Sequence, residues 1–442
     1  MKKESDSFLQ SGPAPNSEVP HLVERLFRHE AGKIVATLTR IFGSSNLAMA
    51  EDLVQEALLR ALQVWSYGEI PSNPAGWIMQ VAKNQALDLL RREDTFKSKE
   101  REIAEWLGQS SLDSAGFDSL FPDHEIQDDQ LRMMFTCCHS LLSPESQVAL
   151  TLKTLCGFSV AEISRAFLTS EAALAKKLVR ARQKIREADI PFEIPAGEEL
   201  TPRLDSVLHA LYLLFNEGYK ASEGESLVRE ELCREAIRLT ELLAEHPVGN
   251  RPKTHALLAL MLLAAARLST RVDAEGNLLL LQEQDRLRWD RDLITQGLMS
   301  LTQAAAGDEV SEYHLQAGIA ACHCTADDYQ STDWTRILSL YDRLVEVNDS
   351  PVIALNRAVA VAQAHGPRAG IEAIARIPGQ EKIKSYYLFY GVLAALHSQL
   401  DDYPNHLAAI AHYRQALELS ATEPERSFLA GRLRSSADQA NV

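Results

Sequence analysis

Four of the cations between positions 176 and 184 can gather on one face of a helix, namely Lys176, Lys177, Arg180 and Lys184. On a helix that turns about 100° per residue they share one side, where they can meet successive phosphates of a nucleic acid. The preceding Ser170, Ala172 and Ala173 are small, so the start of this helix could approach base edges in a major groove. An ordinary helical hairpin with a solvated basic face explains the same pattern, so both interpretations stay open at this point.

Two short helices must position these cations. Ser159 and Glu162 have the spacing of a capping box, which predicts a first helix from about residue 159. Residues 168–170 break the apolar period, and Ser170 offers a hydroxyl cap for the second helix. The second helix then carries a narrow apolar seam on the side away from the cations, made of Leu174, Leu178, Ala181 and Ile185.

A polar cluster of another kind lies on a helix predicted over residues 47–65. Asp52, Gln55 and Glu56 recur at i, i+3 and i+4, so they share one face. Such a trio is typical of a solvated face. An acidic surface of this kind can also dock a basic surface of a partner protein.

Residues 67–73 form a predicted loop, after which Asn73 can cap a helix that begins at Pro74. The polar side chains on that helix are Gln80, Lys83, Asn84, Arg91 and Arg92. A loop bearing Tyr67 beside a basic, amide-rich helix could hold unstacked bases by stacking and by hydrogen bonds to their edges. Trp65 and Trp77 are more typical of a core than of a base-stacking platform.

Composition limits the function classes. The 442-residue chain has a net charge of −16, which is the wrong sign for a protein that coats nucleic acid by bulk charge. Residues 1–195 hold 22 basic and 27 acidic side chains, whereas the remainder holds 23 and 34. Any contact with DNA must therefore be local, and the C-terminal half should repel phosphate.

The cysteines and apolar runs favour a cytoplasmic protein. The six cysteines lack paired CxxC spacing, which indicates reduced thiols, and the neighbouring clusters at 137–139 and 322–324 are weak metal candidates. The N-terminus has no apolar stretch of the kind that makes a secretion signal. The run from Ala256 to Ala266 is too short to span a bilayer.

The predicted fold class is all-α. From about residue 200 onward the chain reads as helix upon helix, rich in Ala and Leu. Residues 351–366 resemble the first half of a tetratricopeptide unit and residues 413–424 the second half of one, without a regular thirty-four-residue period. We predict an α-solenoid-like array there. The predicted organisation is a disordered N-terminus (1–20), a helical bundle (21–95), a linker (96–126), a helix-turn-helix domain (127–190) and the helical array (198–442).

Two stretches in this order resemble a known family. The sequences AEDLVQEALLRAL (50–62) and PAGWIMQVAKNQALDLLRRE (74–93) resemble region two of the sigma-70 family of transcription initiation factors. Residues 141–185 resemble region four of the same factors. The presence of only these two regions is similar to the extracytoplasmic-function (ECF) group. The C-terminal extension is similar to that of a subgroup with a tetratricopeptide-like domain.

The resemblance implies a role for each cluster. It implies that Asp52, Gln55 and Glu56 dock on RNA polymerase core. It implies that the minus-ten promoter element is read by Tyr67, Asn73, Trp77, Lys83, Asn84, Arg91 and Arg92. It implies that the minus-thirty-five element is met by Ser170, Glu171, Ala173, Lys176, Lys177, Arg180 and Lys184. Two departures stand out: the turn at 167–169 lacks the Gly often found there, and Ala173 and Ala175 replace polar readers, so the cations are expected to contact phosphates more than bases.

Three functions follow as hypotheses. The first is a sigma factor, which uses no catalysis and no cofactor and has core polymerase and promoter DNA as partners. The second is a helix-turn-helix regulator with a helical sensor domain and no core binding. The third is an enzyme built on the C-terminal helices, where the dense polar clusters at 216–219 and 327–329 are typical of caps and turns. We expect the extension to regulate activity, either by masking the basic helix or by presenting a groove to a protein or peptide partner.

Overall fold

The computed structural model of the protein describes residues 18–92, 123–166, 169–219, 228–273, 277–400, 402–420 and 422–440. Within these ranges the regular secondary structure is helical, apart from one isolated β-bridge between Val272 and Leu278. The predicted all-α fold class is therefore confirmed. The chain divides into two compact units, residues 1–210 and 211–442.

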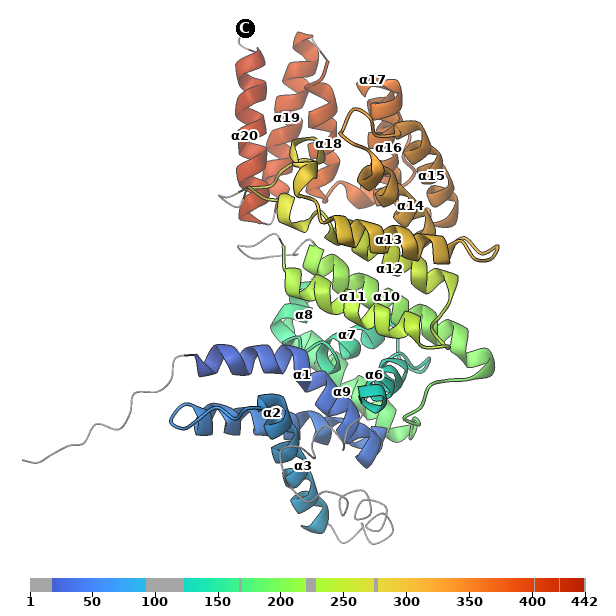
Figure 1. The fold of residues 1–442 in the computed structure, drawn as a ribbon. Coiled ribbons are helices and arrows are strands. Elements are labelled where there is room, and N and C mark those ends of the chain that lie inside the picture. Colours follow the sequence, from blue (N-terminus) through green and yellow to red (C-terminus); the bar gives the residue numbers. More distant parts are fainter. Residues whose placement is uncertain are drawn as a thin grey trace, which may run out of the picture. The chain divides into compact units, whose positions relative to one another are not determined.

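Three helices at the start of the first unit pack against one another: α1 (Val19–Phe42), α2 (Leu47–Trp65) and α3 (Pro74–Arg92) (Figure 1). Their apolar seams meet in a core that includes Leu38, Val54, Trp65 and Ile78. Helix α1 begins inside the segment 1–20 that was predicted to be disordered, because Val19 is fully buried and Pro20 suits a first helical turn. Residues 1–17 lie outside the described residues.

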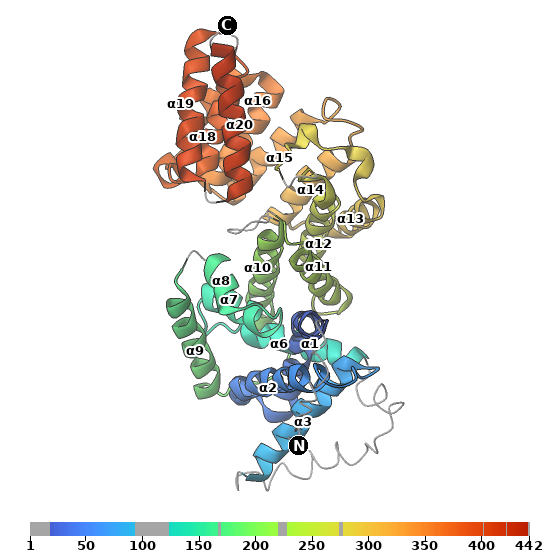
Figure 2. The same cartoon turned by 90° about the vertical axis from the view of Figure 1, so that its left-hand side faces the viewer.

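The next helices among the described residues of this unit are α6 (Asp123–Cys137), α7 (Pro144–Thr154), α8 (Val160–Ala166) and α9 (Glu171–Glu187). Helices α7 and α8 both pack on α9, as two views show (Figures 1 and 2). Helix α6 starts at Asp123, inside the segment 96–126 that was predicted to be a linker. The rest of the predicted linker, up to residue 122, lies outside the described residues.

The two groups of helices in the first unit contact each other directly. Helix α6 packs on α1, and a short 3₁₀ turn, η1 (Ser44–Asn46), packs on α9. Arg40 and Asp129 form an ion pair of 3.0 Å across the α1–α6 contact. A Cβ atom added to Gly32 would lie 2.2 Å from the carbonyl oxygen of Leu155, so only glycine permits this approach of α1 to the end of α7.

The second unit is an array in which most consecutive helices pack on one another, as an α-solenoid-like domain requires. Helix α10 (Leu200–Tyr219) runs across the boundary between the units. The remaining helices are α11 (Glu230–Glu245), α12 (Pro252–Ala265), α13 (Arg291–Ala304), α14 (Glu312–Thr325), α15 (Trp334–Val347), α16 (Pro351–His365), α17 (Pro367–Ala375), α18 (Tyr387–His397), α19 (Tyr403–Leu419) and α20 (Glu423–Ala440). Short 3₁₀ turns are η3 (Gly197–Glu199), η4 (Leu268–Thr270), η5 (Leu281–Glu283), η6 (Arg286–Arg288) and η7 (Gln380–Ile383).

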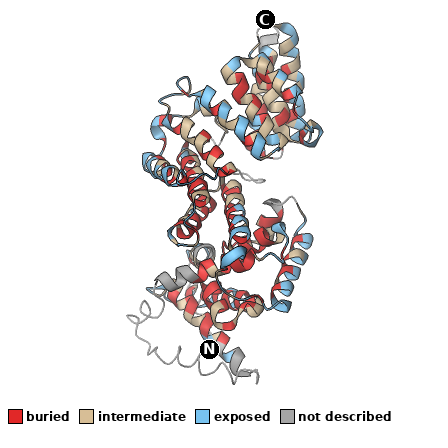
Figure 3. Ribbon diagram, turned by 90° about the vertical axis from the view of Figure 1, so that its right-hand side faces the viewer, coloured by how far each residue is buried: buried red, intermediate tan, exposed pale blue. Residues whose placement is uncertain are grey.

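Burial follows the helix period in both units, with buried and exposed residues on opposite sides of most helices (Figure 3). Helix α12 differs, because nearly every side is covered by α11, α13 or α14. Among the described helices none has the combination of length and apolar character needed to cross a membrane.

Candidate nucleic-acid interface

Local hydrogen bonds start both helices of the predicted helix-turn-helix. The Ser159 amide donates to the Glu162 carboxylate at 2.8 Å, and the Glu162 amide donates to the Ser159 hydroxyl at 3.1 Å. The Ser170 hydroxyl accepts from the Ala173 amide at 3.3 Å at the start of α9. The predicted capping box and the predicted hydroxyl cap are therefore confirmed. Phe167 and Leu168, in the turn between the helices, lie outside the described residues.

Helix α9 has an apolar side and a cationic side. Leu174, Leu178, Ala181 and Ile185 are buried, as the predicted seam requires. The cations Lys176, Lys177, Arg180 and Lys184 fall within an arc of about 100° that is centred roughly 120° away from this seam. Lys176, Arg180 and Lys184 are exposed, and Lys177 is half-buried. The helix therefore presents a cationic face to solvent while its apolar seam is buried; Figure 3 shows the buried and exposed residues of the helices.

This cationic face borders a groove of about 370 Å³ beside the first turn of α7, where Ser143 and Ser146 line the opposite wall. Two of the four cations contact residues on the α7 side of this groove. The Lys177 ammonium lies 2.9 Å from the Glu145 carboxylate, and the Lys184 ammonium donates to the Leu141 carbonyl at 3.3 Å. Lys176 and Arg180 have no such contact recorded within the part of the chain that the structure describes, so they can meet phosphates at little cost.

Two further cations of α9 serve a different purpose, which the sequence analysis missed. Arg182 lies 2.6 Å from the carboxylate of Glu51 in α2, and the same carboxylate accepts from the Thr154 hydroxyl at 2.7 Å. Arg186 donates to the Ser45 carbonyl at 3.3 Å. These contacts join the rear of α9 to α2 and η1. One feature of the sequence could have indicated these contacts. Glu51 occupies an apolar-seam position, with Leu47 four residues before it and Val54 three after, so its carboxylate needs a buried partner.

The predicted polar trio of α2 lies on the outer side of that helix. Asp52, Gln55 and Glu56 are all exposed. Leu59 lies on the same face and is 59% exposed, which is unusual for a leucine in a helical bundle. Beside it, α1 and α2 form an apolar groove of about 370 Å³, lined by Pro20, Val23, Phe27, Gln55, Leu58, Leu59 and Leu62. The face therefore combines acidic groups with uncovered apolar surface.

The loop before α3 carries an exposed aromatic ring, whereas the aromatic ring at the start of α3 is packed. Tyr67 is 68% exposed, as a stacking role would require. Trp77 is half-buried, and its ring centroid lies 5.2 Å from that of the buried Trp65. The Asn73 side chain accepts from the Gly76 amide at 2.9 Å, which confirms the predicted cap at the start of α3.

The polar residues along α3 differ in accessibility. Lys83 is only 7% exposed, and burial lowers the pKa of its ammonium from the ordinary 10.5. Asn84 is exposed, and its side-chain oxygen accepts from Gln80 at 2.9 Å. The side chains of Arg91 and Arg92 lie outside the described part of the protein. Asn84 is thus the predicted polar reader of α3 that the structure places at the surface.

Comparisons with known proteins agree with this arrangement. Residues 26–96 match the family "Sigma-70 region 2" and residues 132–185 match the family "Sigma-70, region 4". The ECF RNA polymerase sigma factor SigM of Bacillus subtilis (strain 168) is 30% identical over 139 residues, which cover 31% of this chain and 78% of that protein. The chain belongs to the ECF family of sigma factors. The resemblance inferred from the sequence is thereby confirmed.

The sigma factor has relatives of two kinds. RNA polymerase sigma factor CarQ of Myxococcus xanthus is 29% identical over 167 residues, covering 37% of this chain and 87% of the relative. An uncharacterized protein of Rhizobium meliloti (strain 1021) is 39% identical over 359 residues, covering 80% of this chain and 83% of the relative, so its match extends into the helical array. Residues 203–305 match a family of unknown function (DUF6596). No solved structure matches the chain.

The weaker candidates from the sequence have structural explanations in the sigma factor. All six cysteines are free thiols, and no three His, Cys, Asp or Glu side chains come together as metal ligands within the described ranges. The Asp328 carboxylate accepts from the Ser331 amide at 2.7 Å in a turn. Glu217 is buried in an ion pair of 3.3 Å with Arg229. Both polar clusters of the extension thus have structural partners.

Proposed function

We propose that this sigma factor binds RNA polymerase core through the outer face of α2 and directs it to promoters that the α3 region and α9 recognise. The observation that supports this most strongly is the presence of sigma-70 regions two and four on one chain, with an uncovered acidic and apolar face in the first and an uncovered cationic face in the second. A helix-turn-helix regulator would need only the second.

The core-binding surface is proposed to consist of Asp52, Gln55 and Glu56 with the neighbouring Leu59. Leucine burial supplies affinity that is not sensitive to salt, whereas the carboxylates favour a basic partner surface and fix the orientation. Leu59 is exposed beside an apolar groove, so binding of a partner here would remove apolar surface from water.

The promoter contacts are proposed to fall on two sites. For the minus-thirty-five element, Lys176, Lys177, Arg180 and Lys184 would bind phosphates, while the slim start of α9 from Ser170 to Ala173 would approach base edges. For the minus-ten element, Tyr67 would stack on an unpaired base and Asn84 would offer its amide. Trp77, Asn73 and Lys83 would support that site structurally, because ring packing, a helix cap and burial respectively already engage them.

The test is retention of purified core polymerase by the tagged full chain. We expect Asp52→Lys with Glu56→Lys to abolish retention, and Glu346→Lys with Glu418→Lys, two exposed acids of the second unit, to leave it unchanged. Run-off transcription on promoter-library DNA by core plus the wild-type chain should then give defined start sites. A chain that binds DNA but never retains core would instead be the helix-turn-helix regulator.

We further propose that the C-terminal extension regulates this activity, by masking α9 or by holding a protein or peptide partner. Its larger excess of acidic over basic side chains supports masking of a cationic helix. A shortened chain that ends at residue 210 tests this. The cut keeps Arg203, whose guanidinium donates to the Phe135 carbonyl at the end of α6. Promoter affinity equal to that of the full chain would exclude masking.

A further inference from the structure

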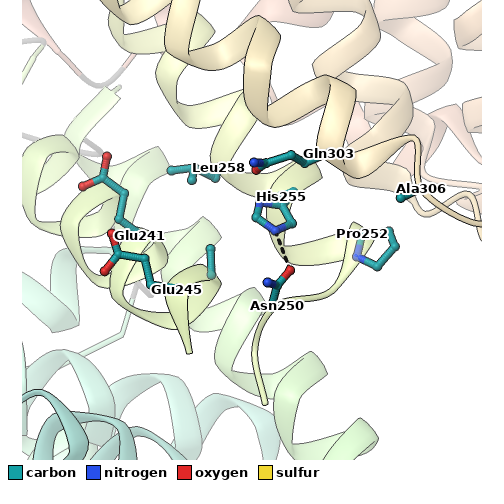
Figure 4. Close-up of a pocket in the computed structure, with 9 residues that line it drawn as sticks. Glu241, Glu245, Asn250, Pro252, His255, Leu258, Gln303 and Ala306 are labelled. Atoms are coloured by element: carbon teal, nitrogen blue, oxygen red, sulfur yellow. Dashed lines mark hydrogen bonds between the residues drawn. The ribbon is translucent and has the colours of Figure 1, made fainter. Parts of the chain in front are cut away.

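The second unit contains a polar pocket of about 620 Å³ that no assigned role explains. Its walls come from α11, α12, the loop between them and the end of α13 (Figure 4). The side chains of Glu241 and Glu245 point away from His255, whose Nε2 atom lies 2.9 Å from the side-chain oxygen of Asn250 (Figure 4). Because these groups do not converge on one point, the pocket indicates no ligand class.

The outer face of α9 gives a clearer indication, because it has an apolar side next to its cations. Ala172, Ala175 and Val179 recur at i, i+3 and i+7, and all three are exposed. At about 100° per residue they are centred about 120° from the buried seam of the helix and about 120° from the centre of its four cations. The line opposite the seam therefore falls between the apolar side and the cations.

Val179 is the residue of this apolar side that local structure does not explain. It is 61% exposed, so it adds little to the core. Valine is also a poorer helix former than alanine, because its branched side chain loses χ1 freedom in a helix. Val179 therefore stabilises neither the core nor the helix, but its single preferred rotamer holds two methyl groups in a fixed direction outside α9.

Two observations favour DNA as the surface that meets Val179. Residues 132–185, which include α9, match sigma-70 region 4. The exposed Lys176 lies three residues before Val179, so the two side chains are neighbours on the helix surface. A duplex that received α9 in its major groove along the line opposite the seam would meet the cations on one side and Val179 on the other.

We propose that Val179, with Ala172 and Ala175 beside it, reads the minus-thirty-five element by packing on the C5-methyl groups of thymines. The inference rests on the proposed promoter contact of α9. Thymine presents a methyl group in the major groove, whereas the other bases present hydrogen-bonding groups that an apolar side chain cannot satisfy. Residues 172–179 rise about 10 Å along the helix, which corresponds to about three base pairs. The readout should therefore be confined to about three adjacent base pairs.

Removing single methyl groups from the DNA tests this readout. The protein is the full chain bound to core polymerase, and the DNA is a promoter selected by run-off transcription. Each thymine of its minus-thirty-five element, on either strand, is replaced in turn by uracil, which lacks only the methyl group. We expect about a fourfold loss of affinity in filter binding for each contacted thymine, and unchanged affinity for uracil in the spacer between the two elements.

Matched valine variants assign the effect to α9. In Val179→Ala the loss caused by uracil should disappear at one or two adjacent positions, because the shorter side chain no longer reaches the methyl group, while alanine preserves the helix at this exposed position. Val347→Ala, at a valine of the second unit that is 55% exposed, should keep the full loss. If no thymine of the element is sensitive, or if Val179→Ala keeps every sensitivity of the wild type, the readout is overturned while promoter binding stands. A wild-type chain that brings core polymerase to no promoter would overturn the promoter assignment and this readout with it.

Discussion

Helices α3 and α9 were both expected to meet DNA, yet they expose their cations very differently. On α9, Lys176 and Arg180 extend into solvent. On α3, Lys83 is 7% exposed, and burial lowers the pKa of its ammonium. Both helices are amphipathic and carry basic residues, so composition and period do not separate them.

The difference follows from the immediate neighbours on each helix face. Lys83 stands four residues after the buried Met79 and three before the buried Ala86, so its side chain starts from the core side of α3. Lys176 and Arg180 have no buried residue three or four positions away. A cation with buried neighbours on both sides along its helix face, such as Lys83, is itself covered, whereas Lys184, with a buried neighbour only at i−3, stays exposed. A helical-wheel count of charges alone therefore overstates the basic face.

Reversing the exposed cations of α9 should have the largest effect. We expect Lys176→Glu, Arg180→Glu and Lys184→Glu together to lower the promoter affinity of the chain bound to core on the order of a thousandfold at physiological salt. The negative slope of log affinity against log salt concentration should also become shallower by about 3, because about three phosphate contacts are lost. Filter binding across a salt series measures both quantities.

The control for that experiment reverses three exposed cations of the second unit, Arg343, Lys382 and Arg414. Its total charge change is the same, so any effect of bulk charge appears equally in both proteins. If the control loses as much affinity as the α9 variant, the cationic face of α9 is not a local DNA contact.

The rear of α9 allows a second test, on what holds the helix in place. Glu51→Ala removes the carboxylate that Arg182 and Thr154 share, and both side chains of the ion pair are less than one fifth exposed. Leaving a buried guanidinium unpaired should lower the free energy of local opening of α9 by about 3 kcal/mol. Amide hydrogen exchange of α9 in the full chain measures it.

Asp52→Ala, at the exposed neighbour of Glu51, provides the matched control and should leave exchange in α9 unchanged. Equal exchange in wild type and the Glu51 variant would show that the apolar seam alone anchors α9. The difference between α3 and α9 would then lie only in how far each helix exposes its cations.

The features that the sequence could predict are local, and those it could not predict depend on tertiary contacts. The seam of α9, the box formed by Ser159 and Glu162, and the cap at Asn73 depend on residues within one helical turn, so local pattern was enough to find them. The ion pair of Glu51 with Arg182 joins residues 131 positions apart, and the pocket at His255 needs three helices to meet. Such features depend on tertiary packing, which no local period encodes.

The hydroxyl cap of α9 should have a smaller effect. Ser170→Ala removes the acceptor of the Ala173 amide, which should cost about 1 kcal/mol of local stability at the exposed start of the helix. Ser170→Asp restores a cap but adds negative charge where DNA would approach. We expect hydrogen exchange at residues 172–174 to increase in the Ala variant only, and promoter affinity to fall further in the Asp variant. Equal promoter affinity in the two variants would place the start of α9 away from DNA.

The smallest effect should come from replacing the buried Lys83 by methionine, with the exposed Lys176 replaced in the same way for comparison. Lys83→Met keeps the apolar stem of a buried side chain and removes its charge, so promoter affinity should change less than twofold, whereas Lys176→Met should weaken it roughly threefold to tenfold.

The folded state holds the Lys83 proton less tightly than the unfolded state does, because burial lowers the pKa of Lys83. As pH rises through this lowered pKa toward 10.5, the folded state releases the proton first and the wild-type protein gains stability.

The Met variant lacks that gain. Calorimetric unfolding of both full-length proteins at pH 7 and pH 10 should therefore show the wild type improving relative to Lys83→Met as the pH rises. Lys176→Met, at an exposed position, should follow the wild type at both pH values. A pH-independent difference between wild type and Lys83→Met, together with a large loss of promoter affinity, would mean that Lys83 reaches the DNA after all and that α3 and α9 use their cations alike.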